Sequence, residues 1–294
     1  MPRHSREVLK TFEVATPLEI DLSTVNGGLE VSGHDGSTAT VEAHARFHAA
    51  SDELAAQLAS LIEEEIEYER GRLRLRPPRE AFPGIGRGFW AAFSTERNWH
   101  ELEVDYELKL PRDSQGEIRC VNGRIECTHV TGPLKASSVN GSVEIEDVPS
   151  PTDLKTVNGR IQVRNYGGGE AKMTNGRLLL QGPLGPIDLS GMNGRMEIES
   201  PAAAVTVNSM NGPVTLSGPI RGDIDIKTMN GAILLQVPTD SSFEIDAFSQ
   251  GGDVSSDLDV HEERPGQGER PLVRLRSNHG SIRITALEQA AASA

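Results

Sequence analysis

The chain has 294 residues, of which 36% are hydrophobic and 4% aromatic, and its formal net charge is −14. The hydrophobic content is enough to bury a core, and the length can hold one large domain or two ordinary ones. The negative charge argues against a large basic surface for nucleic acid or anionic lipid. High glycine content with few aromatic residues is typical of a turn-rich all-β chain.

The N-terminal part, residues 8–47, has the alternation of β-strands. Apolar residues recur at spacings of two, as at Leu18, Ile20 and Leu22. The phrase Val-Asn-Gly-Gly-Leu-Glu-Val then begins at Val25. It returns 96 residues later, so the same architecture starts early and is interrupted.

Residues 51–67 form the one predicted helix. Ser51 is a plausible N-cap, and Leu54, Leu58, Leu61 and Ile62 make an apolar stripe at helical spacing. Such a stripe serves core packing more often than it serves a partner groove. We therefore expect the helix to lie against one end or flank of the β structure.

Arginines alternate with leucines after the helix. Arg70, Arg72, Arg74, Arg76 and Arg79 would share one face of a strand. An anion site is one interpretation. The preferred one is a solvated strand face that the acidic residues between Glu63 and Glu69 neutralise.

Residues 80–100 break every pattern and hold five of the nine Phe and Trp residues of the chain. A glycine-rich aromatic loop of this kind is either a flap folded onto the β structure or an exposed contact for a partner. Its glycine run lacks the residues of a phosphate loop. The possible partner-contact residues are Phe82, Phe89, Trp90, Phe93 and Trp99.

A strand is expected over 101–111, and a regular repeat of Asn-Gly units follows it. Successive asparagines lie 18, 18, 17, 18, 18 and 19 residues apart. The third and fifth residues after each Asn, and the fourth before it, are apolar in every copy, whereas the intervening residues are mostly polar. Each repeat is therefore two short strands with one buried and one wet face.

The Asn-Gly pairs are predicted to be structural turns. A sharp two-residue reversal needs positive φ at both positions, which Gly accepts and Asn tolerates. Degenerate copies follow at Gly251 and His279. The turn residues are Asn26, Gly27, Asn122, Gly123, Asn140, Gly141, Asn158, Gly159, Asn175, Gly176, Asn193, Gly194, Asn211, Gly212, Asn230 and Gly231.

Two folds satisfy this pattern: an antiparallel meander of hairpins and a β-solenoid with one repeat per rung. A meander would be an open sheet of about 14 strands with an uncovered apolar face. A solenoid buries the apolar columns between its own two walls. We predict an all-β fold, a single β-solenoid of two-strand rungs with one inserted helix.

The expected organisation has three parts. Residues 8–111 hold the N-terminal strands, the helix and the aromatic loop, and residues 112–288 hold the regular repeats. Residues 289–294 are predicted to be a disordered tail.

No cofactor, metal site or catalytic residue is predicted. Cys120 and Cys127 flank one Asn-Gly, and Cys127 takes a slot that Ile, Val or Leu fills elsewhere. Cys127 is therefore interpreted as a small buried core residue and not as a redox centre. No Cys/His spacing suggests zinc.

The repeated Val-Asn-Gly-x-Ile-x-Val units, with the early Asn-Gly-Gly-Leu-Glu-Val and the Val-x-Tyr-x-Leu-x-Leu-Pro strand at 104–111, resemble a known family. It is the bacterial putative-adhesin domain of unknown function, related to the toast-rack domains. The resemblance covers roughly residues 8–288 and implies a β-solenoid-like stack, often associated with the envelope or with envelope-stress regulation. It provides no catalytic residues, and many members carry a signal or a transmembrane helix.

The leading hypothesis is a non-enzymatic scaffold or interaction protein. Its expected partner is another protein or a second copy of the chain, and a polysaccharide is an alternative. No nucleic acid is expected. One alternative is a carbohydrate-active β-helix enzyme that uses outward acids such as Asp153, Asp188, Glu197, Asp223 and Asp225. Another is a polymer built by end-to-end stacking. The N-terminus lacks a secretory signal core and no apolar run reaches transmembrane length, so the expected location is the cytoplasm, or the envelope if the start is truncated.

Overall fold

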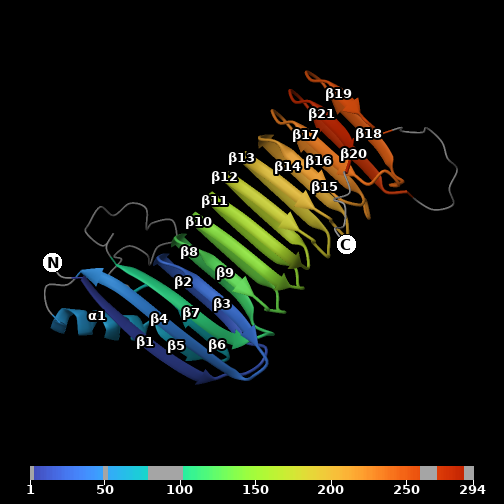
Figure 1. Ribbon diagram of the computed structural model, residues 1–294. Coiled ribbons are helices and arrows are strands. Elements are labelled where there is room, and N and C mark those ends of the chain that lie inside the picture. Colours follow the sequence, from blue (N-terminus) through green and yellow to red (C-terminus); the bar gives the residue numbers. More distant parts are fainter. Residues whose placement is uncertain (1–2, 49–51, 79–101, 259–269, 288–294) are drawn as a thin grey trace, which may run out of the picture. The chain divides into compact units, whose positions relative to one another are not determined.

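The computed structural model describes residues 3–48, 52–78, 102–258 and 270–287, which form two compact units, 1–150 and 151–294. Apart from one helix, the elements of the described residues are all β-strands (Figure 1). The all-β prediction is confirmed. Unit 1 contains β1 (Arg3–Glu13), β2 (Glu19–Asn26), β3 (Leu29–His34), β4 (Thr38–His48), α1 (Asp52–Glu64), β5 (Ile66–Glu69), β6 (Arg72–Leu75), β7 (Glu103–Pro111), β8 (Gln115–Asn122), β9 (Ile125–Thr128) and β10 (Leu134–Val148).

Unit 2 contains the remaining strands. They are β11 (Thr152–Tyr166), β12 (Gly169–Gln181), β13 (Ile187–Glu199), β14 (Val205–Asn211), β15 (Val214–Ser217), β16 (Ile224–Thr228), β17 (Ile233–Val237), β18 (Glu244–Ser249), β19 (Val254–Ser256), β20 (Leu272–Ser277) and β21 (Ile282–Ala286).

Each repeat is one rung with two halves, one before and one after its Asn-Gly corner. In unit 1 the first half of β10 pairs in parallel with β8, and its second half with β9, so that Asn140 lies opposite Asn122. The rung β8/β9 stacks in turn on β2/β3, with Asn122 opposite Asn26. Parallel, in-register pairing of equal positions is the pattern of a solenoid and excludes the antiparallel meander. We call the strand halves before the corner the first wall, and those after it the second wall.

Unit 2 stacks its rungs in the same way, from β11 through β12 and β13 to β14/β15 and β16/β17. The next rung in space is not the next in sequence. The last strands, β20 and β21, pair with β16 and β17 on one side and with β18 and β19 on the other. The degenerate copy at Gly251 is therefore the outer rung, and the copy at His279 lies between it and the regular repeats.

The core lies between the two walls. The predicted columns at three and five residues after the Asn, and four before it, are buried in every regular copy. A further inward column, two residues before the Asn, was not expected because its members are chemically mixed. It includes buried Thr24, Cys120, Ser138, Thr156, Met173, Ser209, Thr228 and Ser277.

The helix is shorter than expected. It covers Asp52–Glu64, and β5 begins at Ile66, because Ile66 and Tyr68 continue in strand alternation against Leu75 and Leu73 of β6. Ala55, Leu58 and Ile62 are buried, and α1 contacts β1 and β5. Lys10 of β1 donates hydrogen bonds from Nζ to the carbonyl oxygens of Glu63 and Ile66. The helix thus lies against the N-terminal strands of its unit, as predicted.

The interruption of the repeat also follows rung geometry. β6 pairs in parallel with β2, and β7 pairs in parallel with β3. The two strands together form a rung next to β2/β3. β4 and β1 then extend the second wall as antiparallel strands.

Candidate functional site

The Asn-Gly corners form a ladder of side-chain amides. Within each unit, successive corner asparagines are linked by a hydrogen bond from Nδ2 of one to Oδ1 of the Asn one rung before it. In unit 1 Asn140 donates to Asn122 and Asn122 to Asn26, each at 2.9 Å. In unit 2 the same bonds link Asn230, Asn211, Asn193, Asn175 and Asn158 at 2.8–3.0 Å. The asparagine is required because an amide can donate and accept along a stack.

The glycines are required by a close approach between rungs. A Cβ atom built at Gly176 would lie 1.7 Å from the carbonyl oxygen of Gly159, and one at Gly212 would lie 1.9 Å from that of Gly194. The expected positive φ at both corner positions is wrong for the asparagines, none of which has one. Among the corner glycines it is found at Gly27, Gly123, Gly176 and Gly212 and not at the other four. The corner is a bend in a continuing ladder, not a hairpin turn, so the Asn keeps an extended backbone.

The left-handed backbone occurs at the second reversal instead. The seventh residue after the Asn has a φ of 58° at His129, 54° at Asp147, 49° at Asn165, 60° at Gly182 and 50° at Ser200. Non-glycine residues rarely adopt this conformation. The stacking geometry therefore fixes the turn at a position whose residue type varies.

The five aromatic residues proposed as a partner contact, Phe82, Phe89, Trp90, Phe93 and Trp99, lie outside the described residues.

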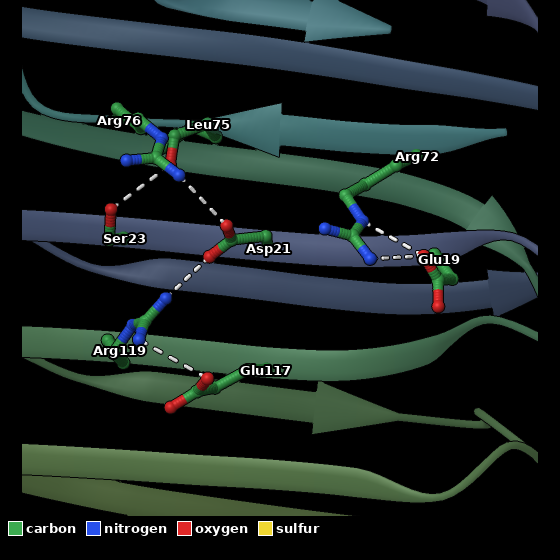
Figure 2. A network of polar contacts seen from close by, with 8 residues as sticks. All are labelled: Glu19, Asp21, Ser23, Arg72, Leu75, Arg76, Glu117 and Arg119. Carbon is green, nitrogen blue, oxygen red and sulfur yellow. Dashed lines mark hydrogen bonds and ion pairs between the residues drawn. The ribbon is translucent and has the colours of Figure 1, made fainter. Parts of the chain in front are cut away.

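The arginine-rich strand is ion-paired on the outer face of the first wall of unit 1 (Figure 2). Arg72 donates to Glu19 at 2.6 Å, and Asp21 accepts from Arg76 at 3.1 Å and from Arg119 at 2.6 Å. The solvated, neutralised face was expected, and the carboxylates that pair with Arg72 and Arg76 come from β2. Because β2 is the register partner of β6, acids distant in sequence lie beside these arginines.

Both cysteines are free thiols that are fully buried in the core, which confirms the prediction made for Cys127. Burial raises the pKa of Cys127 to about 12, and burial with the nearby Asp105 carboxylate raises that of Cys120 to about 12. A thiol with such a raised pKa is a poor nucleophile at neutral pH. Both side chains therefore act as core fillers.

The outward acids do not gather around one point. Asp188 and Asp225 share a column but are separated by Thr206 on the rung between them. Asp225 pairs with Lys227 at 2.8 Å, Glu197 pairs with Arg177 at 2.5 Å, and Asp223 accepts the backbone N–H of Leu272 at 2.9 Å. These acids are in structural contacts, and their arrangement favours no glycosidase pair.

One mixed cluster has the composition of a cation site. Ligand atoms of Glu42, His44 and Glu107, on β4 and β7, lie within 4.8 Å of one another. His44 Nε2 is 3.3 Å from Glu42, and Lys109 Nζ is 3.1 Å from Glu107. All three residues are partly exposed, and ion pairing accounts for their proximity.

One concavity lies on unit 2, outside the first wall and beside the Asn ladder. It is an open groove of about 430 Å³ that runs along β14, β16 and β20. Its sides include Met210, Met229 and Arg276. Gly191, Ser209 and Thr228 also line it. Ser209 and Thr228 belong to the inward column two residues before the Asn, and both are buried.

Exposed methionines form a row along this groove. Met192, Met210 and Met229 each immediately precede the corner Asn of consecutive rungs, and they are 47%, 43% and 47% exposed. In unit 1 the same position holds Val25, Val121 and Val139, all buried. The charges beside the row are neutralised, since Lys227 pairs with Asp225 and Arg276 with Asp246. A row of exposed, flexible and polarisable methionines suits binding of an apolar segment better than chemistry.

Sequence analysis did not identify this groove. The change from Val-Asn-Gly to Met-Asn-Gly in the later copies was the available signal. The exposure of the residue before the corner Asn could not be predicted. The chain bends at the corner, so the alternation of buried and exposed residues does not assign this position to either face.

No protein-family model and no curated protein matches the chain. Solved structures do match it. One is described as a putative cell adhesion protein from Clostridium sporogenes ATCC 15579; it is 14% identical, has a TM-score of 0.27, and the match covers 97% of this chain and 100% of that one. Another is described as a putative adhesin from Bacteroides fragilis NCTC 9343; it is 14% identical, has a TM-score of 0.37, and the match covers 96% and 97%. In the described part of the chain, no helix is long and apolar enough to cross a membrane.

Proposed function

We propose that this chain is a non-enzymatic interaction protein whose stacked rungs present a regular surface to a partner, in the context of the cell envelope or of envelope-stress regulation. The observation that carries the proposal is the methionine row of unit 2. Three large apolar side chains stand exposed on consecutive rungs beside a groove, where the core does not need them. Exposed apolar patches of this kind mark contact sites.

A comparison of partner recovery tests this proposal. The intact chain and the triple variant Met192→Ser, Met210→Ser, Met229→Ser are used as baits on extracts of the source cells, and recovered proteins are quantified. We expect one set of proteins to be lost with the triple variant. Leu184→Ser is the matched control, since Leu184 is 57% exposed but lies away from the row. Equal recovery by all three baits would contradict the groove as the contact.

The aromatic segment is a second part of the proposed contact. Deletion of residues 82–99 should lower recovery of the same partners. Unchanged recovery would remove that segment from the proposal. Cell fractionation that found the protein and its partner away from the envelope would contradict the proposed context.

Self-association is the second candidate, and the outer rung of unit 2 favours it. Among the described strands, none pairs with the free edge of β18 and β19, and Phe248 and Val254 are 57% and 46% exposed there. Unpaired strand edges are templates for pairing with another chain. Light scattering over a concentration series should show association that Val254→Lys abolishes, whereas a constant mass would exclude this candidate.

A further inference from the structure

The second wall of unit 2 carries a row of three arginines that have fewer carboxylate partners than the equivalent arginine of unit 1. Arg160, Arg177 and Arg195 each follow the corner Asn by two residues, on β11, β12 and β13. They lie directly opposite one another in the parallel register. Neighbouring strands are about 4.8 Å apart, so the three arginines leave the backbone at that spacing, and all three are exposed.

Arg124 of unit 1 holds the equivalent position and is paired with two carboxylates. Its guanidinium pairs with Glu126 of its own rung at 2.9 Å and with Glu144 of the next rung at 2.5 Å. Both acids hold the position four residues after an Asn. An arginine at the second position is therefore neutralised by acids at the fourth position of two consecutive rungs.

In unit 2 most of these acidic positions are uncharged. The positions that would neutralise Arg160 hold Gln162 and Leu179. Arg160 has no carboxylate partner among the described residues. For Arg195, the fourth position of the next rung holds Thr215, where an acid would be needed to neutralise the arginine.

One carboxylate serves the other two arginines. Glu197 pairs with Arg177 at 2.5 Å and with Arg195 at 3.5 Å, and its side chain is only 17% exposed. Like charges directly opposite on neighbouring strands are destabilising. The row therefore carries uncompensated positive charge in a chain whose formal net charge is −14.

The first wall of the same unit shows that this imbalance is local. There Lys172 pairs with Glu170 at 2.5 Å and Lys227 with Asp225 at 2.8 Å. Acids and lysines alternate on that wall, as on an ordinary solvated surface. Within the described part of unit 2, the second wall of β11–β13 presents aligned cations with fewer acids beside them.

We propose that Arg160, Arg177 and Arg195 bind a linear acidic polysaccharide through its carboxylates. Guanidinium groups pair with carboxylates through two parallel hydrogen bonds, which favours this anion class. Each sugar of a linear polyuronate carries one carboxylate, so one chain can offer several carboxylates to the three arginines. Single-stranded nucleic acid is disfavoured, because the three strands place no aromatic side chain beside the arginines for bases to stack on. The site is separate from the methionine row, so either proposal can fail alone.

The test uses the full chain and polygalacturonate as the probe, by calorimetry at low salt and at 0.15 M salt. We expect binding that weakens as salt rises, and the triple variant Arg160→Gln, Arg177→Gln, Arg195→Gln to bind about tenfold more weakly or worse. Arg124→Gln is the matched control, since it removes an arginine that is already neutralised, and it should leave the affinity unchanged. The methionine-row variant should also bind normally.

A second variant keeps every arginine. Leu179→Glu supplies the missing acid and reproduces the arrangement of Arg124 with Glu126 and Glu144. It should weaken binding severalfold while the thermal unfolding midpoint stays the same or rises, which separates loss of the site from loss of the fold. No binding by the intact chain, equal binding by the triple variant, or an equal loss with Arg124→Gln would overturn the proposal. Tighter binding of an oligothymidylate than of polygalacturonate would assign the row to nucleic acid instead.

Discussion

The methyl group of Met196 occupies the space that a side chain at Gly191 would need. A Cβ atom at Gly191 would lie 2.1 Å from Met196 Cε. Gly191 belongs to the first half of β13 and Met196 to the second, so this contact joins the two walls within one rung. The neighbouring rung makes the opposite choice, with a larger Ser209 before the corner and a smaller Val214 after it.

This complementarity predicts coupling between the two positions. Gly191→Ser should lower the free energy of unfolding by about 1–3 kcal/mol, because it overpacks the core. Adding Met196→Val should recover much of the loss, since the pair then matches its neighbour. A double-mutant cycle by urea unfolding measures the coupling, which should be at least about 0.5 kcal/mol. Additive losses would mean that the two walls do not pack as described.

The corner glycines should tolerate no side chain. In Gly176→Ala the new methyl group would meet the carbonyl oxygen of Gly159, which is backbone and cannot move without breaking the ladder. We expect a loss above about 3 kcal/mol or failure to fold. Gly71→Ala is the control for a strained glycine with free space, because it has a φ of 78° and no atom within 4 Å. Soluble expression and thermal unfolding compare the two, and equal losses would contradict the close approach.

The amide ladder should contribute measurably to stability. Asn193→Ala removes the bond that Asn193 donates to Asn175 and the bond that it accepts from Asn211. A net contribution of about 1 kcal/mol for each bond gives an expected loss of about 1–2 kcal/mol by urea unfolding. Met192→Ala, on the adjacent exposed residue, should change stability by less than about 0.5 kcal/mol. A harmless Asn193→Ala would show that the ladder does not stabilise the stack.

The left-handed residues at the second reversal offer a stabilising change. Ser200 has a φ of 50°, which glycine adopts without the steric cost of a Cβ atom. Ser200→Gly should therefore raise the free energy of unfolding by up to about 1 kcal/mol. The reverse change Gly182→Ser, at the equivalent position with a φ of 60°, should lower it by a similar amount. Thermal unfolding of both variants checks the opposite signs.

The buried thiols predict a loss of stability in alkali. Below pH 9 both the folded and the unfolded chain keep the Cys127 proton. Above pH 9 the unfolded thiol loses its proton while the folded one, with a pKa of about 12, retains it. The free energy of unfolding should then fall with rising pH, by up to about 1.4 kcal/mol for each pH unit per thiol.

Cys127→Val should weaken this dependence. Val31 and Ile145 lie opposite Cys127 on the adjacent rungs, so a valine suits the column. Unfolding measured between pH 8.5 and 10 should give a smaller slope than that of the intact chain. Cys120 still titrates in this variant, so some slope remains. An unchanged slope would show that Cys127 does not contribute to it.

Much of the fold could be predicted from the repeat. Apolar residues at fixed distances from each Asn indicate which positions share a buried column. The nearly constant period indicates rungs of equal length. Of the candidate sites, the burial of Cys127 and the neutralised arginine strand were predicted. The acids that neutralise Arg72 and Arg76 were not. The methionine row and the unmatched Arg160 were not predicted.

The sequence by itself determined the period, the inward columns and the all-β class of this protein, because these are properties of spacing along the chain. The tertiary structure alone decided why the corners are Asn-Gly. Side-chain amides bond only when equal positions stack, and a glycine is required only where the backbone of the next rung approaches closely. It also decided that β20 and β21 lie inside β18 and β19, and that Leu179 stands where an acid would neutralise Arg160. Both depend on which rungs are neighbours in space.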